Sequence, residues 1–143
     1  MKKRTKFILC ILIGYTFLLF YWMIFGFNRT VMPDYSYNLT PFATIRWFWM
    51  GAHLSLWERM VNLVGNVVVF IPFGILLPPF FQGKFKQSFL LFFCVLFLFE
   101  TIQLLTKRGS FDTDDFILNS LGFCLGYCLF RFFNYCFKRI CLR

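Results

Sequence analysis

Acidic residues are scarce in this sequence, and their scarcity argues against a soluble domain. The chain of 143 residues has only 6 Asp and Glu, and charged residues make up 15% of it against 59% hydrophobic residues. This balance is typical of a membrane protein. There is a single histidine, His53, and it stands in an aromatic loop. We therefore interpret it as a polar contact at the membrane interface rather than as a catalytic base or a metal ligand.

A cysteine pattern for cross-linking or metal binding is also missing. The 6 cysteines fall within expected helices or near one end of the bundle, and none lies in the loops of the opposite side. No disulfide framework and no CxxC metal site is indicated. We expect no metal and no cofactor.

Long apolar runs are what the sequence has in abundance. A helix needs about 20 apolar residues to cross about 30 Å of hydrocarbon. Four stretches reach this length, at residues 7–27, 61–81, 88–105 and 116–137. The first run ends without the small residues of a signal cleavage site, so we expect it to stay as an anchor. The predicted fold class is an all-α membrane protein, one domain over residues 1–143, with a bundle of four transmembrane helices.

The loop between the first two spans is expected to lie outside the cell, at the membrane interface. "NLTPFATIRWFWM" predicts a short helix there, with Thr40 as N-cap and Pro41 at the first helical position. Its tryptophans, Trp47 and Trp49, suit the headgroup level, where aromatic rings are enriched.

Lysine and arginine are distributed unevenly between the two sides of the predicted bundle. Ten basic and no acidic residues flank the side that carries both termini, whereas five basic and five acidic residues flank the other. The positive-inside rule then places both termini in the cytoplasm of a multi-pass protein of the cell membrane. The net charge of +9 reflects topology and contacts with membrane lipids, and we expect no nucleic-acid partner.

Polar residues within the spans gather at one depth. Asn62 and Asn66 stand in the first turns of the second span, Glu100 and Gln103 in the last turns of the third, and Asn119 one turn into the fourth. Because these spans alternate in direction, all five side chains fall in the outer third of the bilayer. A carboxylate inside a membrane helix costs about 2.5–3.5 kcal/mol without partners, so we expect Glu100 to face the interior of the bundle or a wet cavity. The alternative is that these amides only join helices by hydrogen bonds.

Three aspartates, Asp112, Asp114 and Asp115, precede the fourth span. One acidic residue suffices as an N-cap. Asp115 stands one turn before Asn119 and so points toward Glu100, and we predict that Asp112 and Asp115 form the mouth of a binding site. Asp114 is expected to be a cap or a solvated residue. The predicted ligand-binding set is Arg29, Asn62, Asn66, Glu100, Gln103, Arg108, Asp112, Asp115 and Asn119.

Small residues and prolines mark expected contacts between helices. Pro72 and Gly74 interrupt the second span and should kink it. Gly122 and Gly126 form a small-xxx-small face, which lets a neighbouring helix approach closely. Gly65, beside Asn62 and Asn66, is expected to pack in the same way. The Gly122/Gly126 face is also a candidate surface for a homo-oligomer.

Four sequence blocks, taken in order and spacing, resemble the signature of the VanZ-like family of bacterial membrane proteins. They are "NLTPF" (38–42), "NLVGNVVVFIPFGILLP" (62–78), "ETIQ" (100–103) and "RGSFDTDDFILNSLGFCLGY" (108–127), and the resemblance covers about residues 29–130. The family is named for a protein associated with resistance to teicoplanin, a lipid-tailed glycopeptide that acts on cell-wall precursors outside the membrane. The motif positions that the resemblance carries over are Arg29, Asn38, Pro41, Asn62, Gly65, Asn66, Pro72, Gly74, Glu100, Gln103, Asp112, Asp115, Asn119, Gly122 and Gly126.

Three functions compete at this stage. The first is a non-enzymatic envelope protein whose outer-leaflet pocket binds a cell-wall lipid precursor or the acyl tail of a lipoglycopeptide, lowering susceptibility to teicoplanin-type antibiotics. The second is an outer-leaflet hydrolase or transferase that uses Glu100 with Asp112 or Asp115 as catalytic groups. We favour the first, since no base is spaced to activate Ser110, the only serine near the aspartates. The third, an ion-coupled transporter, lacks a second polar cluster and an inverted repeat.

Overall fold

The structure is a computed structural model that describes residues 3–26, 29–50 and 55–141; His53 lies outside these ranges. In chain order the elements are α1 (Lys3–Phe25), β1 (Ser36–Asn38), α2 (Ala43–Met50), α3 (Leu56–Val68), α4 (Ile71–Leu76), the 3-10 helix η1 (Pro78–Phe81), α5 (Phe85–Leu105), β2 (Ser110–Asp112) and α6 (Thr113–Cys141).

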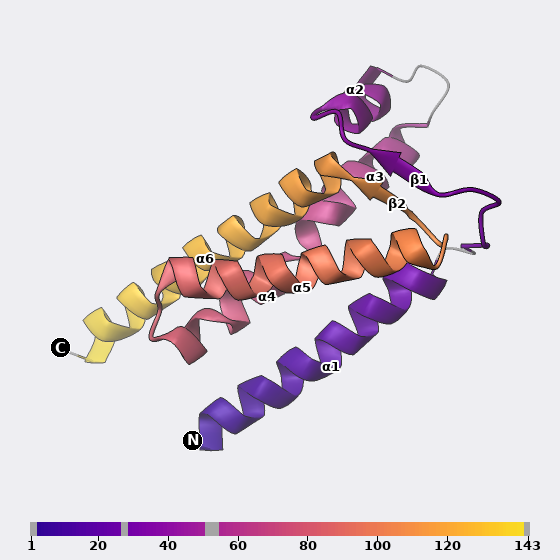
Figure 1. Ribbon diagram of the computed structural model, residues 1–143. Coiled ribbons are helices and arrows are strands. Elements are labelled where there is room, and N and C mark those ends of the chain that lie inside the picture. Colours follow the sequence, from indigo (N-terminus) through magenta and orange to yellow (C-terminus); the bar gives the residue numbers. More distant parts are fainter. Residues whose placement is uncertain (1–2, 27–28, 51–54, 142–143) are drawn as a thin grey trace.

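Four segments are long and apolar enough to cross a membrane: Thr5–Phe25, Arg59–Phe81, Phe85–Leu105 and Thr113–Phe137. They overlap the four predicted spans, so the predicted fold class is confirmed. The start of α1 and the end of α6 lie at one end of the bundle, and β1, β2 and α2 lie at the other (Figure 1). We call these the terminal end and the loop end.

The second span is interrupted, as expected from its proline. Helix α3 ends at Val68, and after a two-residue turn α4 begins at Ile71, with Pro72 in its first turn. Proline has no N–H to donate, so it is tolerated only where a helix begins. The break therefore divides this span into α3, which serves the loop end, and α4 with η1, which lead to the terminal end.

Glycines bring α6 into backbone contact with α3 and α4. A Cβ added at Gly122 would lie 2.0 Å from the carbonyl oxygen of Val67, and one at Gly126 would lie 2.0 Å from that of Ile71. At Gly74 an added Cβ would lie 2.1 Å from the carbonyl oxygen of Phe123. The expected close approach is thus made within the chain. Because α3 and α4 cover this face, it is not open to a second copy of the chain. Association of two chains stays a prediction, and this face does not support it.

Gly65 behaves differently from the other glycines. A Cβ added there would meet nothing within 4 Å. The structure therefore does not give Gly65 the packing role that we expected from its sequence position. Instead its backbone borders an open space at the loop end.

Phenylalanine rings fill the centre of the bundle. Phe70, in the turn that breaks the second span, and Phe73 of α4 meet Phe92 of α5 and Phe123 of α6 in one buried cluster. The rings of Phe92 and Phe123 stack with their centroids 4.7 Å apart. Inside a membrane such packing holds helices together by van der Waals contact, since lipid is as apolar as the side chains. This cluster supports the inner wall of the loop end.

A short parallel ladder closes the loop end, and it was not predicted. Strand β1 pairs with β2 in the register Ser36↔Ser110, Tyr37↔Phe111 and Asn38↔Asp112. Its consequence is that the segment after α1 is tied to the start of α6. Residues 36–38 of the predicted interfacial loop are therefore held against the start of α6.

Candidate functional site

A cavity of about 520 Å³ opens at the loop end, and we call it the loop-end cavity. Helices α1, α2, α3, α5 and α6 and strand β2 all contribute to its lining. Its apolar wall includes Leu19 and Trp22 of α1, Phe48 of α2 and Val61 of α3. Every residue of the predicted ligand-binding set except Arg108 lines it. The structure thus brings together polar residues that are far apart in the sequence. The most distant two, Arg29 and Asn119, are 90 positions apart.

Glu100 and Asn119 are buried polar residues in this lining. Glu100, in the second half of α5, is 1% exposed, and Asn119, in α6, is 2% exposed. Glu100 Oε2 and Asn119 Oδ1 have no hydrogen-bond partner among the residues that the structure describes. A buried acceptor without a partner costs about 1–3 kcal/mol, and such groups are normally paired. We therefore expect the contents of the cavity to donate hydrogen bonds to both atoms.

Asp115 is held in place by an amide from another helix. Asn66 Nδ2 of α3 donates a hydrogen bond of 2.7 Å to Asp115 Oδ1 of α6. Both side chains line the cavity, together with Asn119 one turn further along α6. The expected shared face of Asp115 and Asn119 is therefore present. The second carboxylate oxygen of Asp115 is the part of this pair that can serve a ligand.

Asp112 has a structural role as well as a place in the lining. Its Oδ1 accepts a hydrogen bond of 2.9 Å from the backbone N–H of Asp114, which caps the start of α6. Its Oδ2 accepts a hydrogen bond from Thr44 Oγ1 of α2, and Asn38 Nδ2 lies 3.5 Å from Oδ1. These bonds occupy both oxygens. Asp112 therefore shapes the cavity mouth and is poorly placed to act on a bound molecule.

Asp114 caps a helix other than its own. It is 0% exposed, and its carboxylate accepts hydrogen bonds from the backbone N–H groups of Phe42 and Ile45. These donors belong to the start of α2, so the solvated alternative for Asp114 was wrong, and the cap is on α2. Thr40 was also wrong as the N-cap, because α2 begins at Ala43 and its cap comes from α6.

The two arginines at the rim separate into different environments. Arg29 lines the cavity and donates from Nη1 to the carbonyl oxygen of Arg108 at 3.2 Å. Arg108 donates in return to the carbonyl oxygen of Arg29 at 3.3 Å, and its guanidinium lies 5.0 Å from the centre of the Phe25 ring. Arg108 is therefore placed against α1, outside the lining, whereas we had expected both arginines to reach the ligand.

Gln103 and Gly109 hold this rim together. Gln103 Nε2 donates a hydrogen bond of 2.7 Å to the carbonyl oxygen of Met23, which joins α5 to α1. A Cβ at Gly109 would lie 2.7 Å from Arg29 Nη1. Sequence reasoning missed Gly109, and also missed Thr44 and Ser110 in the lining. Only Ser110 had a signal in the sequence, namely its place beside the aspartates.

The cavity combines a polar floor with an apolar wall. Three carboxyl groups, those of Glu100, Asp112 and Asp115, and one guanidinium, that of Arg29, belong to residues of the lining. Within the described ranges, no group of three or more His, Cys, Asp and Glu side chains is arranged to hold a metal ion. The arrangement suits hydrogen-bond donors or cationic groups at the floor and an aliphatic chain along the wall.

Comparisons with known proteins identify the family of this chain. A family model described as VanZ/LLP1 matches residues 7–134. Among curated proteins the chain is similar to Protein VanZ of Enterococcus faecium, with 28% identity over 126 residues that cover 84% of this chain and 71% of that protein. No solved structure matches the chain significantly. Because the family model spans nearly all of the transmembrane bundle, the chain belongs to the VanZ/LLP1 family.

Proposed function

We propose that this multi-pass membrane protein binds a lipid-linked ligand in the loop-end cavity, at the outer leaflet of the cell membrane. The orientation rests on the basic residues, which gather without any acidic residue at the terminal end. The loop end then lies outside, at the depth where acyl chains meet headgroups. A ligand with an apolar chain and a polar head can meet both kinds of lining at that depth.

The single observation that carries the proposal is the pair of unpaired acceptors at the cavity floor. Glu100 Oε2 and Asn119 Oδ1 are buried without a partner among the described residues. In contrast, the carboxylates of Asp112 and Asp114 accept hydrogen bonds from other parts of the chain. A binding role explains why these two polar groups are kept in a membrane protein. Amides that only join helices would be expected to have their partners within the chain.

Two ligands fit this description. One is a cell-wall precursor on its lipid carrier, whose sugar hydroxyls and amines supply donors. The other is the acyl-bearing end of a teicoplanin-type lipoglycopeptide, and binding of that molecule would lower susceptibility to it. The similarity to Protein VanZ of Enterococcus faecium and the membership of the VanZ/LLP1 family support this second ligand.

The test measures binding of each ligand to the purified full chain in lipid nanodiscs. Glu100→Gln keeps the shape of the floor and removes the carboxylate, and we expect affinity to fall at least about tenfold, or about 1.4 kcal/mol. Gly65→Leu places a side chain in the open space and should block the cavity, because a Cβ at Gly65 meets nothing within 4 Å.

Arg108→Gln is the matched control, since Arg108 lies at the same rim but outside the lining. It should bind as the unaltered chain does. If Glu100→Gln and Gly65→Leu both bind the ligand as the unaltered chain does, with normal amounts of folded protein, the ligand does not bind in this cavity.

A second candidate is an enzyme at the same place, and the free oxygen of Glu100 favours it. Glu100 and Asp115 line one cavity, so a general acid and base could act together on a lipid or wall precursor. Mass spectrometry of the precursor after incubation with the protein separates the two functions. A new species that forms with the unaltered chain and not with Glu100→Gln supports catalysis, and an unchanged precursor supports binding alone.

A further inference from the structure

A second cavity, of about 540 Å³, lies at the terminal end of the bundle. We call it the terminal-end cavity. Its apolar wall comes from Ile8 of α1, Pro79 of η1 and Phe130 of α6. Its polar lining includes Gln82, Arg131 and Asn134. The two cavities share no lining residue.

A fixed turn forms one side of this cavity. Gln82 and Gly83 have positive φ angles of 55° and 77°, so the chain turns sharply between η1 and α5. Tyr127 of α6 donates a hydrogen bond of 2.8 Å from its hydroxyl to the carbonyl oxygen of Gly83. This bond holds the turn against α6, and the Phe130 ring lies 3.6 Å from the position of a Cβ on Gly83. The side of the cavity formed by the turn and α6 is thus held by contacts between elements.

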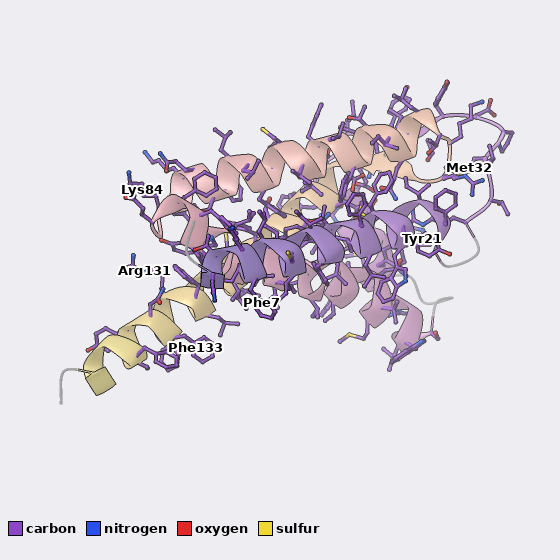
Figure 2. All side chains as sticks on the ribbon, turned by 90° about the horizontal axis from the view of Figure 1, so that it is seen from below. Phe7, Tyr21, Met32, Lys84, Arg131 and Phe133 are labelled. Carbon is purple, nitrogen blue, oxygen red and sulfur yellow. The ribbon has the colours of Figure 1, made fainter. Side chains whose placement is uncertain are left out.

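Charge at this end is of one sign. Figure 2 shows Lys84 and Arg131 at the same end of the molecule, with Tyr21 and Met32 at the other. Lys6, Lys84 and Lys86 are exposed there, close in sequence to residues of the lining. All six acidic residues of the sequence belong to other places: Asp34, Glu58, Glu100, Asp112, Asp114 and Asp115. Among the residues that the structure describes, the guanidinium of Arg131 therefore has no Asp or Glu side chain within its part of the bundle.

We propose that the terminal-end cavity binds an anionic phospholipid, with the phosphate at Arg131 and one acyl chain along Ile8 and Phe130. A guanidinium presents a planar fork of N–H donors that matches a phosphate. The amides of Gln82 and Asn134 add donors for the phosphate or the glycerol oxygens. A phosphodiester on an acyl-bearing glycerol satisfies both the charge and the apolar wall of one cavity, which a soluble phosphate does not. This site is independent of the proposed ligand of the loop-end cavity.

The test measures lipid retention by the purified full chain. The protein is exchanged into nanodiscs of equal phosphatidylglycerol and phosphatidylcholine, then extracted in mild detergent, and the retained lipid is counted by native mass spectrometry. We expect phosphatidylglycerol to be retained over phosphatidylcholine. Arg131→Gln should lower that preference about tenfold, or about 1.4 kcal/mol. Lys86→Gln, which removes an exposed charge at the same end outside the lining, is the matched control and should keep most of it.

Three outcomes would overturn the proposal. Equal retention of the two lipids by the unaltered chain would remove the preference for a charged headgroup. Equal losses in Arg131→Gln and Lys86→Gln would show diffuse attraction by surface charge instead of a site. Displacement of the lipid by an equal concentration of soluble glycerol phosphate would assign the cavity to a free phosphate ester. Persistence of the lipid under that competition supports a ligand held by both its phosphate and its acyl chain.

Discussion

The loop end and the terminal end of the bundle treat charge in opposite ways. At the loop end, the carboxyl groups of Glu100, Asp112 and Asp114 are buried. Carboxylates there accept hydrogen bonds from other elements, as Asp112 does from Thr44 and Asp115 from Asn66. At the terminal end, basic side chains are exposed, and no Asp or Glu lies beside them among the described residues. The loop end is therefore ordered by polar contacts within the chain, whereas we propose that the basic residues of the terminal end meet anionic lipid.

The first way to break this comparison is to remove the buried carboxylate that organises the loop end. Asp114→Ala deletes the acceptor of two backbone N–H groups of α2. We expect the free energy of unfolding to fall by about 3 kcal/mol, since each hydrogen bond to a charged group contributes about 1.5–3 kcal/mol. Unfolding by SDS in mixed micelles, followed by circular dichroism, measures this loss.

Asp34→Ala is the control for that measurement, because Asp34 lies at the same end but is exposed. Its effect should stay within about 0.5 kcal/mol, as is usual for surface substitutions. Equal losses for the two aspartates would mean that burial and capping at the loop end do not add to the free energy of unfolding.

A second substitution tests the contact that joins the two ends. Gly126→Ala places a Cβ 2.0 Å from the carbonyl oxygen of Ile71, so α6 must move away from α4. We expect a loss of about 1–3 kcal/mol, the usual cost of overpacking. Gly14→Ala in α1, where an added Cβ meets nothing within 4 Å, should be neutral or stabilising in the same SDS titration. A neutral Gly126→Ala would contradict the close helix contact.

The hydroxyl of Tyr127 gives a smaller and more local effect at the terminal end. Tyr127→Phe removes the hydrogen bond to Gly83 while the ring stays in place. We expect the free energy of unfolding to fall by about 1 kcal/mol, the net contribution of an ordinary hydrogen bond. Tyr21→Phe, at an exposed position of α1, is the comparison variant and should change it less.

The smallest effect is expected when a substitution in one cavity is tested for its influence on ligand binding in the other cavity. Gly65→Leu should leave phosphatidylglycerol retention unchanged, and Arg131→Gln should leave ligand binding at the loop end unchanged, because the two linings share no residue. Native mass spectrometry and the nanodisc binding measurement test the two directions. A shift of more than about threefold, or about 0.7 kcal/mol, in either direction would reveal coupling through the aromatic cluster.

The spans and the depth of the polar residues could be predicted because both follow from position along a helix. Apolar runs set the four spans, and alternation of direction placed Asn62, Glu100 and Asn119 at one level. Rotation about the helix axis is harder to predict, and Gly65 shows why: its spacing is that of a packing residue, but it borders open space. Which face of a helix meets a neighbour depends on the whole bundle.

Contacts between distant segments could not be predicted from this sequence. Asp114 accepts a hydrogen bond from Phe42, which is 72 positions away in the sequence. The three-residue strands β1 and β2 have no alternating pattern that would predict their pairing. For the same reason the N-cap of α2 was assigned to Thr40, the nearest residue of the right type. Arg108 was misplaced because its carbonyl and guanidinium are occupied by Arg29 and Phe25, which only folding brings near.

The strand pairing at the loop end has a consequence for how the protein is made. Strand β1 and helix α2 leave the ribosome early, but their partners, Ser110–Asp112 and Asp114, come only after the third span. During synthesis, the segment between the first two spans therefore has neither its cap nor its paired strand until the last helix has begun to insert. Completion of the binding cavity is in this way tied to the arrival of the fourth span.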